Sequence, residues 1–528
     1  MNMASSAAAW RLLALLTLGA LAAPPTAAAD AAGAALLTTE CGDCHKPRPD
    51  GSLERIADAR RSPEGWDMVV GRMSLIHKVQ LGEDKRRALV KYLSDAYGLS
   101  PAESKPWHYV LERRTDSEDR FEDQLVGDTC ARCHTYARIA LQRRTEAEWL
   151  KLSHFHVGQY PTAELQSNGR DRDWWDIASK QLPPLLAKLY PLQSESWSKW
   201  QAQTWVKPSG SWRLVGHRPG RGDYEGQATV KENAANDYSL EMELRYADGK
   251  SEKGSGKLSI FTGYEWRASL TLGDKETRQV FALSEDGSQL SGRWYLRNVD
   301  TLGGDISGVK QGARAAVLAV YPGYLRAGTK QQLAIHGSGL AGRVDLGPGL
   351  RVLREISRSA DSVVVEVQAA KKSSGSRTVR VGELAGKDLL KVYQRIDYLR
   401  IEPARGLARV GDDAGKIPRQ PMAFEAAGYV RSKGGKKDLR IGIFPAQWSF
   451  DNANATAKAF DDARFAGAFE DNGVFMPAVG GPNPKRKFGT NNAGDLKVTA
   501  TVKFGKRKLK ASAPLIVTVQ RWVDPPVR

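Results

Sequence analysis

The chain carries two copies of a short cysteine–histidine motif, and this repeat constrains its fold more than any other feature. The two copies read C-G-D-C-H and C-A-R-C-H and contain Cys41, Cys44, His45, Cys130, Cys133 and His134. Two thiols in this spacing can each add to a vinyl group of one porphyrin, and the adjacent histidine then points at the iron. Together the motifs use all four cysteines, which favours haem attachment over disulfides or a zinc site. The sequence therefore predicts two covalently bound c-type haems, each with its motif histidine as an axial ligand.

The repeat continues beyond the cysteines and indicates the second axial ligand of each iron. Trp66 is followed seven residues later by Met73, and Trp149 is followed seven residues later by His156. Methionine and histidine are the two side chains that commonly complete the coordination of a cytochrome iron. We therefore predict Met73 as a ligand of the first haem and His156 as a ligand of the second. The alternative is a methionine that fills the core and a histidine on the surface.

Three further histidines compete for these positions. His77 lies four residues past Met73 and on the same helical face, whereas His154 lies two residues before His156 and on a different face. His108, in the W-H-Y between the two copies, is expected to have a structural role.

Residues 1–29 have the features of a cleaved secretory signal. Arg11 precedes the apolar run L-L-A-L-L-T-L-G-A-L-A-A, and the small residues Ala27 and Ala29 frame a cleavage site before Asp30. No later stretch approaches the roughly 18 apolar residues of a membrane-spanning helix, so the mature protein is expected to be soluble. Bacterial c-type haem is attached outside the cytoplasm, and we therefore predict a periplasmic protein.

The remaining chain is too long for one hydrophobic core, and its composition changes once, near residue 205. The first part has helical periodicity and all the cysteines, whereas the second alternates with a period of two between Gly-, Asp- and Asn-rich turns. We predict a multidomain α and all-β protein with the following order of domains: an α-helical di-haem cytochrome c domain at 30–205, an antiparallel β-barrel domain at 206–312, and two immunoglobulin-like β-sandwiches at 313–395 and 396–528.

Individual segments support this division. The best-marked helix is expected at 82–98, where Leu89, Leu93 and Tyr97 recur at four-residue intervals before Gly98. Y-S-L-E-M-E-L-R-Y and E-W-R-A-S-L-T-L-G alternate apolar and polar residues, with turns at D-G-K, G-D-K and E-D-G, as in an antiparallel meander. The last domain ends in two expected strands, L-K-V-T-A-T-V-K-F and P-L-I-V-T-V-Q.

Two other patterns do not indicate a function. Gly337, Gly339 and Gly342 spell G-x-G-x-x-G, but the following R-V-D-L-G-P-G-L predicts a turn and a strand rather than the helix of a dinucleotide site. The net charge is +18, with clusters such as P-K-R-K and K-F-G-K-R-K-L-K. Because an exported haem protein seldom meets nucleic acid, we interpret these clusters as solvated loops and edge strands, with an acidic protein partner as the alternative.

A di-haem domain with W-x6-M and W-x6-H, followed by a barrel-like and two sandwich domains on an exported chain, resembles the large (alpha) subunit of quinohemoprotein amine dehydrogenase. The resemblance covers essentially the whole mature chain, and its specific part is the haem domain. It implies a heterotrimer with a β-propeller subunit and a small subunit that bears a cysteine tryptophylquinone. This assembly would oxidise primary amines to aldehyde and ammonia and reduce a soluble periplasmic acceptor such as a cupredoxin or a cytochrome c.

The residues independently favour such a division of labour. A haem iron with two protein ligands has no open position for substrate and passes one electron at a time, whereas amine oxidation is a two-electron reaction. The quinone needs a cysteine thioether, and all four cysteines here are assigned to haem. We therefore expect neither the quinone nor a catalytic residue in this chain. The alternative is a free-standing periplasmic di-haem electron carrier with β domains that anchor it. A di-haem peroxidase is a third interpretation, but it would leave the β half without a role.

Overall fold

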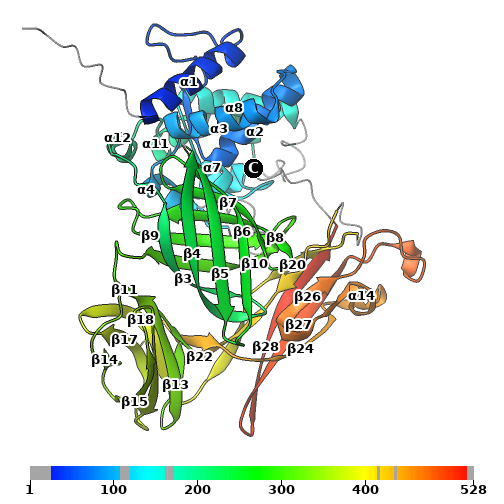
Figure 1. The fold of residues 1–528 in the computed structure, drawn as a ribbon. Coiled ribbons are helices and arrows are strands. Elements are labelled where there is room, and N and C mark those ends of the chain that lie inside the picture. Colours follow the sequence, from blue (N-terminus) through cyan, green and yellow to red (C-terminus); the bar gives the residue numbers. More distant parts are fainter. Residues whose placement is uncertain are drawn as a thin grey trace, which may run out of the picture.

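The computed structural model describes residues 25–107, 119–160, 163, 172–234, 236–412, 417–432, 434 and 437–519. It confirms the predicted multidomain order, in which a helical region is followed by a closed barrel and further β-sheet domains. Figure 1 shows the helical region (blue to cyan) above one end of the barrel (green), and the two later β domains below it.

The helical region repeats one order of elements in its two halves. In each half a helix ends at the first motif cysteine, a short strand follows, and a longer helix carries the predicted second ligand. The first half consists of α1 Pro25–Cys41, β1 Ala59–Arg61, α2 Pro63–His77 and α3 Glu83–Ala96. The second half consists of α6 Gln124–Cys130, α7 Ala137–Ala140, β2 Gln142–Arg144 and α8 Glu146–Gln159. Because α1 begins at Pro25, the predicted signal cleavage before Asp30 falls within this helix.

Similar capping starts α2 and α8, the helices that carry the predicted second ligands. The Ser62 hydroxyl accepts a hydrogen bond from the Gly65 N–H at 3.2 Å, and the Thr145 hydroxyl accepts one from the Glu148 N–H at 3.3 Å. A hydroxyl at this position satisfies a backbone N–H that the first turn of a helix leaves unpaired. The repeat therefore includes the start of each ligand-bearing helix as well as the cysteines.

The helix predicted at 82–98 is present as α3, which buries Leu89 and Leu93 and ends at Ala96. The remaining helices are short: α4 Pro101–Ser104, η1 Lys105–Trp107, α10 Trp174–Asp176, η3 Ile177–Gln181, α11 Leu182–Leu189 and α12 Glu195–Gln201. His108, which the sequence assigned a structural role, lies outside the described residues. In the part of the chain that the structure describes, no helix combines the length and apolar character needed to cross a membrane.

The predicted antiparallel barrel is confirmed as a closed eight-stranded barrel in which consecutive strands pair, and β10 closes onto β3. Its strands are β3 Gly210–Arg218, β4 Gly222–Ala234, β5 Asp237–Tyr246, β6 Ser251–Phe261, β7 Glu265–Leu272, β8 Lys275–Leu283, β9 Gln289–Leu296 and β10 Val299–Lys310. The alternating apolar residues predicted on β5 and β7 are buried in its interior, beside Trp212 and Trp294.

Buried polar contacts join the barrel to the ligand-bearing helix of the first half. The Arg267 guanidinium, on β7, donates to both carboxylate oxygens of Glu64 at 2.7 and 3.2 Å, and to Glu265 at 2.5 Å. Glu64 lies in the first turn of α2. The barrel therefore fixes the position of the helix that carries Met73.

The third domain places two four-stranded sheets around one hydrophobic core. One sheet contains β11 Ala316–Tyr321, β13 Lys330–Ser338, β16 Ser362–Ala369 and β15 Leu350–Arg358. The other contains β12 Tyr324–Arg326, β18 Leu384–Tyr393, β17 Gly375–Val381 and β14 Val344–Asp345. Gly337 lies in β13, and Gly339 and Gly342 have φ of 66° and 92° before β14. The G-x-G-x-x-G motif is therefore a turn between strands, as predicted.

The fourth domain contains three sheets around a separate core. Its strands are β19 Tyr398–Glu402, β20 Gly406–Arg409, β21 Met422–Ala423, β22 Glu425–Val430, β23 Leu439–Ile443, β24 Gln447–Asn452, β25 Gly467–Phe469, β26 Val474–Pro477, β27 Gly494–Phe504 and β28 Arg507–Thr518. Short helical segments lie between them: α13 Ala455–Ala459, α14 Asp462–Phe465, η4 Asp471–Gly473 and η5 Lys487–Gly489. The immunoglobulin type of these two domains stays a prediction.

One basic cluster, P-K-R-K, is not fully solvated as the sequence predicted. Arg486, in P-K-R-K, is 5% exposed and forms an ion pair with Asp462 at the start of α14. Its guanidinium also donates to the Asn491 and Ala493 carbonyls at 2.6 Å each. The prediction was wrong for this residue because the loop closes around the guanidinium and supplies its acceptors.

Candidate functional site

The two halves place the first cysteine of each motif in equivalent surroundings. Cys41 packs against the core that contains Trp66, and Cys130 packs against the core that contains Trp149. All four cysteines are free thiols. Burial raises the pKa of the Cys41 thiol to about 11 and that of the Cys130 thiol to about 12. Each half therefore presents one partly buried thiol beside its own tryptophan.

Three predicted ligand histidines share one hydrogen-bonding arrangement. The Nδ1 atom of His45 lies 3.1 Å from the Glu54 carbonyl oxygen, and that of His134 lies 3.0 Å from the Thr135 carbonyl oxygen. The Nδ1 atom of His156 lies 2.8 Å from the carbonyl oxygen of residue 152, one turn earlier on α8. Because a carbonyl oxygen only accepts, Nδ1 carries the proton in each ring and Nε2 keeps its lone pair for a metal.

The second half brings His134 and His156 within electrostatic reach of each other. Burial is the main cause that lowers the pKa of His134, to about 4, and the charges of Arg138 and His156 add to it. Burial also lowers the pKa of His156, and the charges of Arg144, Arg72 and Arg138 lower it further. Both imidazoles are therefore neutral at physiological pH, which is the form that binds a metal.

The competing residues differ in exposure and contacts. Met73 is half-buried on α2, and His77 is exposed at the last residue of that helix. His154 is exposed and packs edge-on against Trp175 with 5.0 Å between the ring centroids. The side chains one turn past the predicted ligands are large, apolar and exposed: Ile76 at 44% and Tyr160 at 59%.

These observations fit haem as the resident cofactor. Among the described residues, no group of three or more His, Cys, Asp or Glu side chains is arranged to hold a metal ion by itself. Each half instead offers thiols for covalent attachment, an imidazole with a fixed Nδ1 proton, and apolar surface beside the second ligand. A six-coordinate cytochrome iron takes two protein ligands, and these residues include suitable side chains for both positions.

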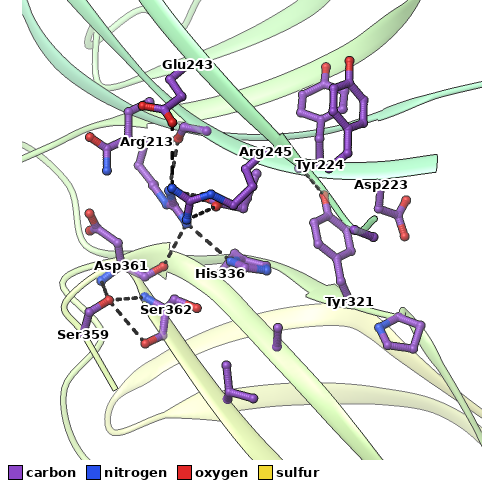
Figure 2. A pocket seen from close by; sticks show the side chains of 18 residues that line it. Arg213, Asp223, Tyr224, Glu243, Arg245, Tyr321, His336, Ser359, Asp361 and Ser362 are labelled. Carbon is purple, nitrogen blue, oxygen red and sulfur yellow. Dashed lines mark hydrogen bonds and ion pairs between the residues drawn. The ribbon is translucent and has the colours of Figure 1, made fainter. Parts of the chain in front are cut away.

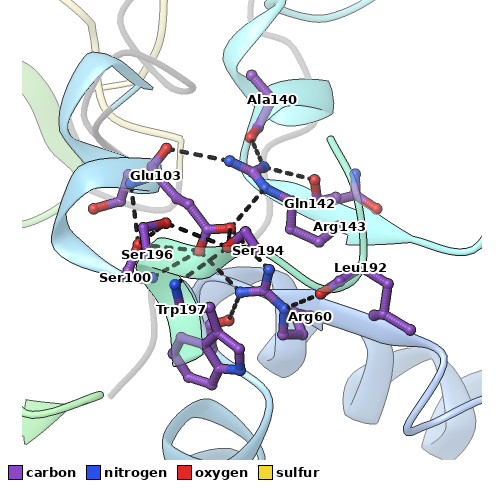
Figure 3. Close-up of polar contacts among 12 residues, drawn as sticks. Arg60, Ser100, Glu103, Ala140, Gln142, Arg143, Leu192, Ser194, Ser196 and Trp197 are labelled. Atoms are coloured by element: carbon purple, nitrogen blue, oxygen red, sulfur yellow. Dashed lines mark hydrogen bonds and ion pairs between the residues drawn. The ribbon is translucent and has the colours of Figure 1, made fainter. Parts of the chain in front are cut away.

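Sequence reasoning missed a second repeat, an Arg-Arg pair that lies just before each ligand-bearing helix. The strands β1 and β2 pair antiparallel, with Arg60 opposite Arg143. Both arginines bind the buried carboxylate of Glu103, Arg60 at 2.8 and 2.9 Å and Arg143 at 3.2 Å, as Figure 3 shows. Burial opposes the charge of Glu103, but Arg60 and Arg143 outweigh it and lower the pKa to about 2. The signal was present in the sequence, because A-R-R-S and Q-R-R-T stand at the same distance before Trp66 and Trp149.

A polar cavity of about 800 Å³ lies between the barrel and the third domain (Figure 2). The Arg213 guanidinium forms an ion pair with Glu225 and donates to His336 Nδ1 at 3.3 Å and to the Asp361 carbonyl at 3.4 Å. Tyr321 donates from its hydroxyl to barrel carbonyls at 3.1 Å. These contacts of Arg213 and Tyr321 join the two domains.

Comparisons with solved structures find matches of low identity and low TM-score. A redesigned β-barrel, mFAP1, bound to DFHBI is 16% identical over 20% of this chain and 94% of its own, with a TM-score of 0.17. Drosophila N-cadherin EC1-4 is 11% identical over 61% of this chain and 95% of its own, with a TM-score of 0.16. TM-scores this low support no inference about fold or function. No curated protein matches the chain.

Family models, by contrast, cover nearly the whole described chain. Residues 31–197 match the model described as quinohemoprotein amine dehydrogenase A, alpha subunit, haem binding. Residues 206–311, 314–394 and 399–527 match the models of alpha subunit domains II, III and IV of the same enzyme. The four matches follow the order of the helical region, the barrel and the two later β domains. The chain therefore belongs to the alpha-subunit family of quinohemoprotein amine dehydrogenase.

Proposed function

We propose that this chain is the electron-transfer subunit of a periplasmic amine dehydrogenase and binds two c-type haems covalently. The observation that carries the proposal is the duplicated arrangement of a C-x-x-C-H motif with histidines whose Nδ1 protons are held by backbone carbonyls. Membership of the alpha-subunit family, which includes a haem-binding domain, supports it.

The residues divide between two sites. Cys41 and Cys44 would attach the first haem, with His45 and Met73 as its axial ligands. The second site uses the equivalent residues of the second half: Cys130, Cys133, His134 and His156. When bound, each haem supplies one-electron redox chemistry. Burial keeps the imidazoles of His134 and His156 neutral, and their backbone acceptors orient them.

The chain is proposed to take electrons one at a time from a quinone cofactor on a partner subunit. A cysteine-derived quinone is not expected here, because all four cysteines belong to the attachment motifs. We therefore assign oxidation of primary amines to aldehyde and ammonia to a small quinone-bearing subunit, held together with a β-propeller subunit. The electrons would leave to a soluble periplasmic acceptor such as a cupredoxin or a cytochrome c.

The attachment is tested by mass spectrometry of the denatured mature chain. We expect two haem additions and a mature N-terminus at or near Asp30. Cys130→Ala should impair covalent haem at the second site and leave the first addition in place. A wild-type chain with one haem or none would overturn the proposal.

The division of labour is tested by adding a primary amine to the isolated holo-chain and to its complex with the partner subunits. Amine should reduce the haems only in the complex. Turnover of amine by the chain alone would refute the assignment. Purification of the chain without any tightly held partner would instead favour the free-standing electron carrier.

A further inference from the structure

The strand pair β1–β2 has two faces, and the arginines on the two faces have different hydrogen-bond acceptors. On one face Arg60 and Arg143 share the carboxylate of Glu103. On the other face, which carries the alternate residues, Arg61 and Arg144 lie diagonally across the strand pair. Both are largely buried, at 9% and 6% exposure. The second face is therefore a buried, positively charged surface.

The second face holds less negative charge than its arginines require. Arg61 and Arg144 donate to the same neutral acceptor, the side-chain carbonyl of Gln142, at 2.6 and 3.0 Å. The nearest carboxylate, Glu148, is 3.9 Å from Arg144 and also pairs with Lys151 at 2.7 Å. Buried charges are normally paired, because removing an unpaired charge from water costs several kcal/mol, on the order of the stability of a domain.

Two buried donors on this surface also have no acceptor. The Nε atom of Arg61 and the indole Nε1 atom of Trp149 make no hydrogen bond, and Trp149 is 2% exposed. Its counterpart in the first half, Trp66, donates its indole N–H to the Tyr97 carbonyl at 2.8 Å. The two halves therefore differ at this tryptophan, because the Trp149 N–H has no protein acceptor and the Trp66 N–H has one.

The second face is directed toward the predicted haem ligands. The Arg61 guanidinium lies 5.4 Å from the ring centroid of Trp66, and that of Arg144 lies 5.4 Å from the ring centroid of Trp149. Each tryptophan is two helical turns from the second ligand of its half and therefore on the same helical face. Trp149 also shares its core with Cys130, to which the second haem would be attached.

We propose that Arg61, Arg144 and the indole N–H of Trp149 bind haem propionates, with Arg144 and Trp149 serving the second haem. The proposal rests on the covalent haem attachment proposed above. Propionates are the carboxylates that an attached porphyrin brings inside the domain, where a ligand from solvent does not reach. They supply an acceptor for the indole and negative charge for the arginines, as Glu103 does for Arg60 and Arg143 on the opposite face.

The test compares holoprotein variants that change charge or one donor only. Arg144→Gln and Arg61→Gln remove a charge, and Trp149→Phe removes the N–H and keeps an aromatic ring. Arg87→Gln is the matched control, because Arg87 is an exposed arginine of α3 that pairs with Glu83 and Asp84. The number of covalent haems in each variant is first determined by mass spectrometry. A redox titration then gives the two midpoint potentials.

A cation near a propionate stabilises the reduced iron, so its loss should lower the potential. We expect Arg144→Gln to shift the reduction equilibrium of the second haem by roughly tenfold, as a charge about 10 Å away does at an effective dielectric constant of about 20. Arg144→Lys should restore most of the shift, and Trp149→Phe should produce a smaller shift at the same haem. The resonance Raman bending mode of the propionates should change in the same variants and not in Arg87→Gln.

The outcomes separate the two proposals. A wild-type chain without covalent haem would refute the haem attachment itself. Propionate binding alone would be refuted by variants that carry normal covalent haems but behave like the control. In that case the potentials and propionate modes of Arg144→Gln, Arg61→Gln and Trp149→Phe would equal those of Arg87→Gln. If Arg144→Gln is not exported or loaded, Trp149→Phe decides, because it keeps the charge of the site and an aromatic ring.

Discussion

At the scale of single residues, the two haem sites are expected to differ in the second axial ligand, Met73 in one half and His156 in the other. A thioether favours reduced iron relative to a second imidazole, so the two sites should have different midpoint potentials. Met73→His should lower one potential selectively and abolish the weak absorption band of the iron–thioether bond. A redox titration with optical spectra, beside the wild type, measures both effects.

His77→Ala is the matched control for that experiment. His77 is exposed one turn beyond Met73 on α2, and its loss should leave both potentials and the band unchanged. Survival of the band in Met73→His would mean that Met73 only packs. Absence of the band in the wild type would instead make His77 the leading candidate for the first iron.

At the scale of secondary-structure elements, the strand pair β1–β2 joins the two halves of the haem region around Glu103. Glu103→Gln leaves Arg60 and Arg143 buried without a counter-charge, which typically costs about 3–5 kcal/mol. We expect this loss in denaturant unfolding of the haem domain, followed by circular dichroism in the haem absorption band. Exposed Glu83→Gln, on α3, should change the unfolding free energy by less than about 0.5 kcal/mol.

The same carboxylate predicts that the stability of the β1–β2 strand pair decreases at acidic pH. The pKa of Glu103 falls from 4.5 to about 2 in the folded protein, so its charge stabilises the fold fully above about pH 4.5. This contribution declines below that pH and is lost as the pH falls through about 2. The wild type should therefore lose stability between these pH values relative to Glu103→Gln. Parallel unfolding curves of the two proteins across this range would contradict the prediction.

At the scale of the whole molecule, His217 connects the barrel to the fourth domain. Its Nδ1 atom lies 2.6 Å from Asp223 on β4, and its Nε2 atom lies 2.7 Å from Glu425 on β22. Burial disfavours the charged imidazole, but the hydrogen bonds to Asp223 and Glu425 outweigh it and raise the pKa from 6.5 to about 10. The protonated ring therefore links two carboxylates from two domains at neutral pH.

A raised pKa gives a stabilisation that is complete below about pH 6.5, declines above it and is lost as the pH passes about 10. Limited proteolysis at the domain junction should therefore separate wild type from His217→Gln at pH 6 and not at pH 10.5. His336→Gln is the control, because burial lowers the pKa of His336 to about 4 and keeps this ring neutral over the whole range. A difference between wild type and His217→Gln that persists above pH 10 would show that the link does not depend on the imidazole charge.

The sequence by itself determined the features that depend on local spacing. Alternation with a period of two predicted the antiparallel barrel, because successive side chains of a strand point to opposite faces and β5 and β7 bury one face in the interior. The glycines of the G-x-G-x-x-G motif were recognisable as the end of a strand and a turn because no helix follows them. The predictions of haem attachment and of Met73 and His156 as ligands rest on chain order alone, in the C-x-x-C-H motifs and in W-x6-M and W-x6-H.

The tertiary structure decided which residues meet across long separations. Glu103 binds Arg60 and Arg143, Glu64 binds Arg267, and Arg486 is buried, although each of these residues reads as an ordinary surface charge. The repeated Arg-Arg pair was visible in the sequence, but its division into one neutralised and one unneutralised face follows from the antiparallel register of β1 and β2. Whether a buried charge has a partner depends on groups that other elements bring to it, and no local pattern encodes their positions.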